Sequence, residues 1–180
     1  KGVLALIGDS TNSLTSGKSG SENDVKESLL NIISSESGKV IVSCFASNLA
    51  RIKSIIDAAH KSDREVALVG RSLWRIINVA RETGYLDNSI KLYEAEELSS
   101  LTSKNLLYIC TGSQGEPRAA LTRIAEGKHP YISLCEEDTV IFSSRIIPGN
   151  EKPIFALYNK FARLDVKLIT SKSNMVHVSG

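Results

Sequence analysis

The 180-residue sequence has little of what marks an unusual architecture. It contains three cysteines and four prolines, aromatic residues make up 6%, and 22 basic residues are nearly balanced by 20 acidic ones. Apolar runs such as Val40–Val42 are far shorter than the ~20 residues of a membrane-spanning helix, and no secretory leader opens the chain. These absences exclude a disulfide scaffold, a membrane protein and nucleic-acid binding by overall charge. They predict one packed, cytoplasmic domain over residues 1–180.

The cysteines and basic residues are both expected to have structural roles. The three cysteines, Cys44, Cys110 and Cys135, form no Cys-x-x-Cys pair, and two lie in apolar runs. We expect buried thiols rather than metal ligands or disulfides. The lysines and arginines are spread along the chain, mostly on the faces of expected helices, where they are interpreted as solvated surface. Any contact with nucleic acid must therefore be local.

Short apolar runs alternate with longer amphipathic segments along the chain. Strands are predicted at Val3–Ile7, Val40–Phe45, Val66–Val69, Leu106–Cys110, Val140–Phe142 and Val166–Ile169. Helices are predicted at Glu22–Ser35, Asn48–His60, Leu73–Thr83, Glu116–Ala125 and Lys152–Arg163. Ser21 and Asp24 can cap the first helix, and Pro117 suits a first turn. This alternation predicts an α/β fold: a three-layer, Rossmann-like domain with a mainly parallel sheet and helices on both faces.

Ligands of such sheets bind the loops at the carboxyl ends of the strands. Four of these expected loops are rich in hydroxyl groups, amides and glycine: 8–12, 46–48, 111–116 and 143–151. This chemistry suits a phosphate-bearing polyanion. The alternative is that Ser47, Asn48, Ser113 and Asn150 are only helix caps and turn residues. Trp74 lies on an apolar helix stripe, so we expect it in the core rather than as a platform for base stacking.

The familiar enzyme motifs are missing. Gly17-Lys18-Ser19 resembles the end of a P-loop, but Asn12 occupies the position of the required first glycine. No Gly-x-Gly-x-x-Gly follows the first expected strand, and the segment 112–115 lacks the spacing of a nucleophile elbow. The histidines are scattered, so no metal site is expected within this chain. From these patterns alone, the sequence indicates a phosphate-binding α/β domain.

Six short strings carry a more specific resemblance, which runs in order along nearly the whole chain. They are Gly-Asp-Ser-Thr-Asn (8–12), Cys-Phe-Ala-Ser-Asn (44–48), Val-Gly-Arg-Ser (69–72), Thr-Gly-Ser-Gln-Gly-Glu-Pro (111–117), Ile-Pro-Gly-Asn-Glu (147–151) and Val-His-Val-Ser-Gly (176–180). Together they resemble the β-CASP domain of the ribonuclease J family. The resemblance implies a nuclease that cuts single-stranded RNA internally and from the 5′ end. It further implies two zinc ions, held by a flanking metallo-β-lactamase domain that residues 1–180 lack, and a parent enzyme that forms a homodimer or tetramer.

The resemblance also assigns roles to individual residues. Asp9 matches an acid that orients a general-acid histidine, and that histidine would follow Gly180, where this sequence stops. The isolated chain is therefore expected to be inactive. The residues expected to contact RNA are Ala46, Ser47, Asn48, His177, Val178, Ser179 and Gly180. Further candidates are Arg71, Ser72, Ser113 and Gln114. Two alternatives stay open at this point: a non-catalytic module that binds RNA or nucleotide phosphates, and an interaction scaffold.

Overall fold

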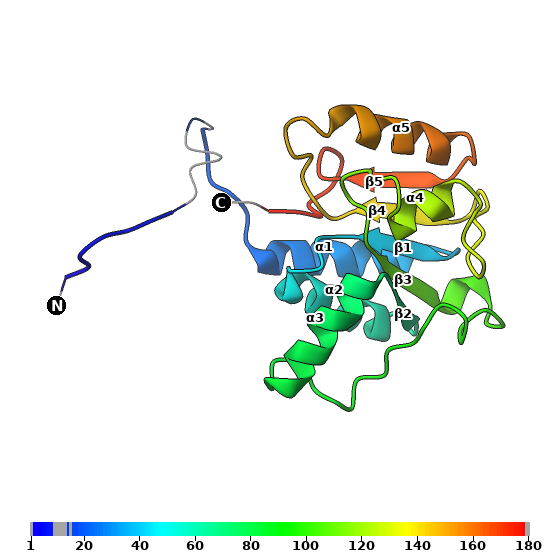
Figure 1. Ribbon diagram of the computed structural model, residues 1–180, viewed down its shortest axis with the longest axis horizontal. Coiled ribbons are helices and arrows are strands. Elements are labelled where there is room, and N and C mark those ends of the chain that lie inside the picture. The colour runs from blue at the N-terminus through cyan, green and yellow to red at the C-terminus, as the bar shows by residue number, and fades with distance from the viewer. Residues whose placement is uncertain (1, 9–13, 15, 179–180) are drawn as a thin grey trace.

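The computed structural model describes residues 2–8, 14 and 16–178 (Figure 1). Within them, helices and strands alternate from the first helix to the last strand. The elements are α1 (Glu22–Ser35), β1 (Val40–Ser43), α2 (Leu49–Lys61), β2 (Glu65–Val69), α3 (Arg71–Glu82), the 3-10 helix η1 (Ser103–Asn105), β3 (Leu106–Cys110), α4 (Ala120–Ala125), β4 (Thr139–Phe142), α5 (Glu151–Ala162) and β5 (Lys167–Thr170). In this part of the chain, no helix is long and apolar enough to cross a membrane.

The five strands form one parallel sheet in the order β2-β3-β1-β4-β5. Ser43 at the end of β1 lies opposite Cys110 of β3 and Phe142 of β4, so the carboxyl ends of these strands meet at one edge. The chain leaves β1 in one direction through α2 to β2, and later continues through β4 to β5 on the other side of β1. The predicted α/β fold with a parallel sheet is confirmed.

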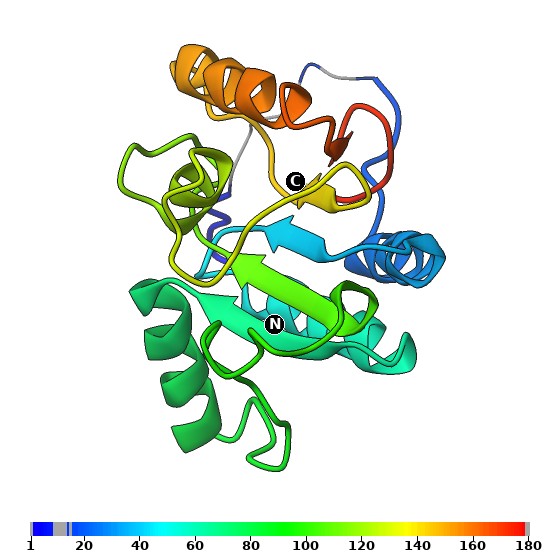
Figure 2. The same ribbon diagram turned by 90° about the vertical axis from the view of Figure 1, so that its right-hand side faces the viewer.

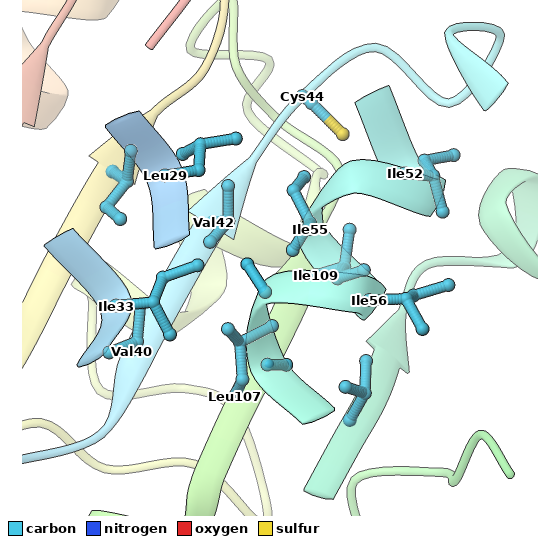
Figure 3. Close-up of a cluster of buried hydrophobic side chains, with 14 of the residues drawn as sticks. Leu29, Ile33, Val40, Val42, Cys44, Ile52, Ile55, Ile56, Leu107 and Ile109 are labelled. Carbon is cyan, nitrogen blue, oxygen red and sulfur yellow. The ribbon is translucent and has the colours of Figure 1, made fainter. Parts of the chain in front are cut away.

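Two apolar cores fill the space between the sheet and its helices. Alternate strand residues face opposite sides, so Val40 and Val42 point to one core and Ile41 to the other. Helices α1, α2 and α3 cover the first face, whereas α4 and α5 cover the second (Figure 2). In Figure 3, side chains of α1 and α2 meet those of β1 and β3 in the first core. Burying each such aliphatic side chain contributes about 1.5–3 kcal/mol, which fixes the helices on the sheet.

Local signals set the starts of the first two helices as predicted. The Ser21 hydroxyl accepts a hydrogen bond from the Asp24 backbone N–H at 3.1 Å, and the Asp24 carboxylate accepts one from the Ser21 N–H at 2.7 Å. This reciprocal pair is a capping box. In α2, the Asn48 side-chain oxygen accepts from the Arg51 backbone N–H at 3.0 Å. Asn48 is therefore a helix cap, as one interpretation of its loop predicted.

Three local predictions are wrong. No strand forms at Val3–Ile7: the segment 2–8 runs away from the rest of the chain (Figure 1), and its apolar side chains are exposed. An apolar run becomes a strand only when a neighbouring strand completes its hydrogen bonds, and no described residue supplies one. Helix α4 begins at Ala120 rather than at Glu116, because a turn through Pro117 precedes it. Cys135 is exposed, since it lies in the turn that leads to β4 rather than inside a strand.

Candidate nucleic-acid interface

A buried arginine lies at the carboxyl edge of the sheet. Arg51 is the third residue of α2, one turn before Ile55 on the side of the helix that faces the core, and its side chain is fully buried. Its guanidinium contacts Glu22 of α1, with Nε donating to Oε1 at 3.1 Å and Nη2 to Oε2 at 2.5 Å. This residue departs from the expectation that basic side chains form solvated surface. A buried charge is tolerated only when it is paired and hydrogen-bonded, as here.

The other end of the guanidinium joins two further segments. Nη1 of Arg51 donates to the Ser143 hydroxyl at 2.7 Å and to the Val176 carbonyl at 2.8 Å. The Ser143 hydroxyl in turn donates to the same Val176 carbonyl at 2.6 Å. Ser143 follows β4, and Val176 belongs to the segment after β5. We call Arg51, Glu22, Ser143 and Val176 the Arg51 network; it ties α1, α2, the loop after β4 and the C-terminal segment together.

His177 extends from this network. Its Nδ1 lies 3.4 Å from Nη1 of Arg51. The two hydrogens of Nη1 already point to the Ser143 hydroxyl and the Val176 carbonyl, so this approach is a close polar contact. Burial lowers the pKa of His177 from its ordinary value of 6.5, and the positive charges of Arg51 and Arg145 lower it further, while Glu22 opposes the shift. A hydrogen bond to the Ser143 backbone also opposes the shift, but the pKa stays lowered, so the imidazole is neutral near pH 7.

Gln114 joins the loop after β3 to the loop after β4. Its side-chain Nε2 donates to the Arg145 carbonyl at 2.8 Å, and its Oε1 accepts from the Ile147 N–H at 2.9 Å and from Asn150 Nδ2 at 3.3 Å. Gln114 and the neighbouring Ser113 are both buried. The amide of Gln114 thus positions the loop that carries Arg145 near His177. A direct contact of Gln114 or Ser113 with RNA stays a prediction.

The loop after β1 lies beside the Arg51 network, because its residue Asn48 caps the first turn of α2, which carries Arg51. Ala46 packs partly against the first core, whereas Ser47 is exposed. Val178 is also partly buried against that core. Among the predicted RNA contacts of this loop, Ser47 has the side chain that solvent reaches most readily.

The remaining predicted residues lie elsewhere or cannot be placed. Arg71 and Ser72 begin α3, at the end of β2, and both side chains are exposed. In the described part of the chain, no hydrogen bond joins them to the Arg51 network. Asp9, Ser179 and Gly180 fall outside the described residues. The structure therefore gathers Ser47, Asn48, Gln114 and His177 at one part of the carboxyl edge and leaves Arg71 and Ser72 farther along the same edge, beyond the end of β2.

Sequence reasoning missed Arg51 and Glu22, which organise this edge, and included Ser143 only as part of the polar loop 143–151. The available signal was a charged residue on the core-facing stripe of an amphipathic helix, a position that needs a partner.

Cys44 lies just beyond β1, near this ion pair. Burial raises the pKa of its thiol to about 12, and the charges of Arg51 and Glu22 have smaller, opposite effects. In the described ranges, no three His, Cys, Asp or Glu side chains lie close enough to hold a metal ion.

Comparison with known proteins assigns the chain to a family. The sequence model of the β-CASP domain of ribonuclease J matches residues 37–161, which contain four of the five strands. The chain belongs to the ribonuclease J family. It is 43% identical to ribonuclease J of Sinorhizobium meliloti over 180 residues, which is 100% of this chain and 32% of the relative. Ribonuclease J of Mycolicibacterium smegmatis is 42% identical over 99% of this chain, and ribonuclease J 1 of Streptococcus pyogenes is 41% identical over 100% of it.

The ribonuclease J match covers only part of the relatives. The chain spans about a third of their length, namely 32% of the proteins from Sinorhizobium meliloti, Mycolicibacterium smegmatis and Streptococcus pyogenes. The five-stranded parallel sheet with helices on both faces is thus the β-CASP domain of this family. The resemblance derived from the six sequence strings is confirmed.

Proposed function

We propose that this chain is the RNA-binding β-CASP domain of a ribonuclease J-like enzyme that cuts RNA internally and from the 5′ end. The observation that carries the proposal is the Arg51 network. One buried guanidinium holds α1, α2, the loop after β4 and the C-terminal segment at the carboxyl edge of the sheet. A phosphate-binding surface built from loops needs such a rigid support, because loops alone do not hold donors in place.

The donors at this edge suit phosphate oxygens. The exposed Ser47 hydroxyl, the neutral imidazole of His177 and the positive charge of Arg145 are the groups that we propose to contact the RNA backbone. The N-terminus of α2 adds a partial positive charge beside Ser47. Backbone contacts of this kind give affinity without reading the bases. The domain is therefore proposed to bind single-stranded RNA of many sequences.

Catalysis is proposed to require the rest of the enzyme. The resemblance implies two zinc ions, which would supply a hydroxide for attack on phosphorus. The described residues contain no three-ligand cluster for a metal ion, so no step is assigned to them as zinc ligands. Asp9, which would orient a general-acid histidine, lies outside the described residues. We propose that residues 1–180 bind RNA but do not cut it.

The test is a fluorescence-anisotropy titration of the 180-residue protein with a short, 5′-phosphorylated, single-stranded RNA at several salt concentrations. We expect saturable binding whose affinity falls linearly with the logarithm of the salt concentration, as counterion release requires. Ser47→Ala should weaken binding at least about tenfold, since a hydrogen bond to a charged group contributes about 1.5–3 kcal/mol. Ser34→Ala, an exposed serine in the last turn of α1, is the matched control.

Two results would count against the proposal. Absence of binding at low salt would mean that this chain alone is not an RNA-binding unit. Equal effects of Ser47→Ala and Ser34→Ala would mean that RNA is held elsewhere. Cleavage is tested separately: a longer protein that includes the flanking regions should cut the same RNA and stop when a chelator removes zinc, whereas the 180-residue protein should not cut it at all.

A further inference from the structure

A cavity lies at the same edge of the sheet as the Arg51 network, at the carboxyl ends of β2 and β3. Its volume is about 730 Å³, and it is bounded by the end of β2, the first turn of α3, the start of α4 and the segments 94–96 and 129–131. None of the Arg51 network lines it. A volume of this size is within the range of small-molecule and cofactor sites, roughly 300–1,000 Å³. The cavity is thus large enough for a nucleotide.

The walls carry an excess of positive charge. Arg71, Arg118 and Arg123 line the cavity, and all three side chains are exposed. No hydrogen bond or ion pair engages these guanidinium groups within the described part of the chain. Glu94 and Glu96 also line the cavity, but Glu96 accepts a hydrogen bond from Tyr131. Unpaired arginines that converge on one cavity are suited to bidentate binding of a phosphate.

The start of α3 adds donors to the same wall. Its N-cap is Gly70, which has φ +140° and no side chain to cap the helix. A Cβ at this position would lie 2.6 Å from Oγ1 of Thr111, so the close approach of the β2 and β3 ends requires glycine. The N–H groups of Arg71 and Ser72 donate to no other described residue. Uncapped amides at a helix N-terminus favour an anion.

Apolar and aromatic side chains make up the rest of the wall. Trp74 is partly buried against the first core, as its helix stripe predicted, and it also lines the cavity. Its indole N–H is buried and has no partner among the described residues. Tyr131 and His129 stand edge to face with ring centroids 6.4 Å apart. Such surfaces suit a nucleobase, and a free carboxylate such as that of Glu94 suits ribose hydroxyls.

We infer that this cavity binds a nucleoside 5′-monophosphate unit, with its phosphate at Arg71, Arg118 and the N-terminus of α3 and its base against Trp74 and Tyr131. The unit can be a free nucleotide or one nucleotide of an RNA chain. Only the second case rests on the proposed function. The cavity would then hold RNA at a point separate from the Arg51 network.

The chain contains one tryptophan, so intrinsic fluorescence reports on this cavity. Titration of the 180-residue protein with adenosine or uridine 5′-monophosphate should give a saturable change in Trp74 emission. The double variant Arg71→Gln/Arg118→Gln should weaken this response at least about tenfold, because both exposed guanidinium groups are removed. Arg75→Gln, an exposed arginine of α3 that does not line the cavity, is the matched control.

Two further arms separate the sources of the ligand. Inorganic phosphate and adenosine, titrated alone, should each bind more weakly than the monophosphate, since each lacks half of the contacts. RNA binding of the double variant is measured by anisotropy: a loss of affinity assigns the cavity to RNA, and unchanged affinity together with a nucleotide response assigns it to a free nucleotide.

The inference is overturned if nucleotides give no saturable change and the double variant binds RNA like the parent. A nucleotide response that is equal in the double variant and in Arg75→Gln would overturn it as well. In both cases, RNA binding that depends on Ser47 would leave the proposed function intact. Conversely, a protein that gives the nucleotide response but does not bind RNA would retain the inference about the cavity and contradict the proposed function. The two failures are therefore distinguishable.

Discussion

Two groups of arginines lie at the carboxyl edge of this sheet, and they have opposite environments. Arg51 is fully buried, paired with Glu22 and bonded to oxygens of two other segments. Arg71, Arg118 and Arg123 are exposed around a cavity and have no ion pair in the described part of the chain. The donors of Arg51 are buried and out of reach of a ligand, whereas those of the second group are exposed. The same residue type therefore supports loops in one region and is free for a ligand in the other.

Replacing Arg51 by methionine should have the largest effect on folding. The substitution keeps an apolar stem in the core but removes the donors for Ser143 and Val176 and leaves Glu22 unpaired. Breaking a buried ion pair typically costs 3–5 kcal/mol, and because the side chain of Glu22 is 37% exposed it can turn to water, so we expect about 3 kcal/mol. Urea unfolding followed by circular dichroism measures the loss.

The matched control is Arg71→Met. An exposed arginine without an ion pair should change the free energy of unfolding by less than about 0.5 kcal/mol. Equal losses for Arg51→Met and Arg71→Met would show that the Arg51 network does not stabilise the fold. The contrast between the two groups would then be one of exposure only.

Gln114→Ala should have a smaller effect, because its hydrogen bonds are neutral and the groups it leaves can be hydrated. Gln114 accounts for three hydrogen bonds to the loop that follows β4. We expect a loss of about 1–2 kcal/mol in the free energy of unfolding. Weaker RNA binding should accompany it, since the loop that carries Arg145 is no longer held. Asn88→Ala, at an exposed amide in the loop after α3, is the control, and a similar loss there would argue against a positioning role.

The comparison also shows what the sequence could predict. The helix bounds of α1 and the strand bounds of β3 match the prediction, because long apolar periodicity and a capping box are local signals. The apolar run Val3–Ile7 carries the same kind of signal, yet it forms no strand. Pairing depends on a neighbour, and the local pattern does not contain that information.

The site was predictable only where short strings resemble a family. Ser47 and His177 were predicted in this way as RNA contacts. Arg51 was not, because its partners lie 29, 92 and 125 residues away along the chain. The cavity at β2 and β3 was missed for a similar reason. Its arginines come from segments that are unrelated in sequence, and only the parallel sheet brings them to one edge.

The smallest predicted effect concerns the charge of His177. Its folded-state pKa is lowered from 6.5 by burial and by the charges of Arg51 and Arg145, so the unfolded chain takes up a proton at a higher pH than the folded chain does. The contribution to stability is therefore complete above pH 6.5 and is lost as the pH falls toward the folded-state pKa. His177→Gln should flatten the decline in the free energy of unfolding between about pH 7.5 and pH 5.5. The pKa of His129 is also lowered, by burial and by Arg123, so His129 contributes separately to the pH dependence of the free energy of unfolding. His129→Gln removes that contribution. If only His129→Gln flattens the curve, the proximity of His177 to Arg51 has no energetic consequence.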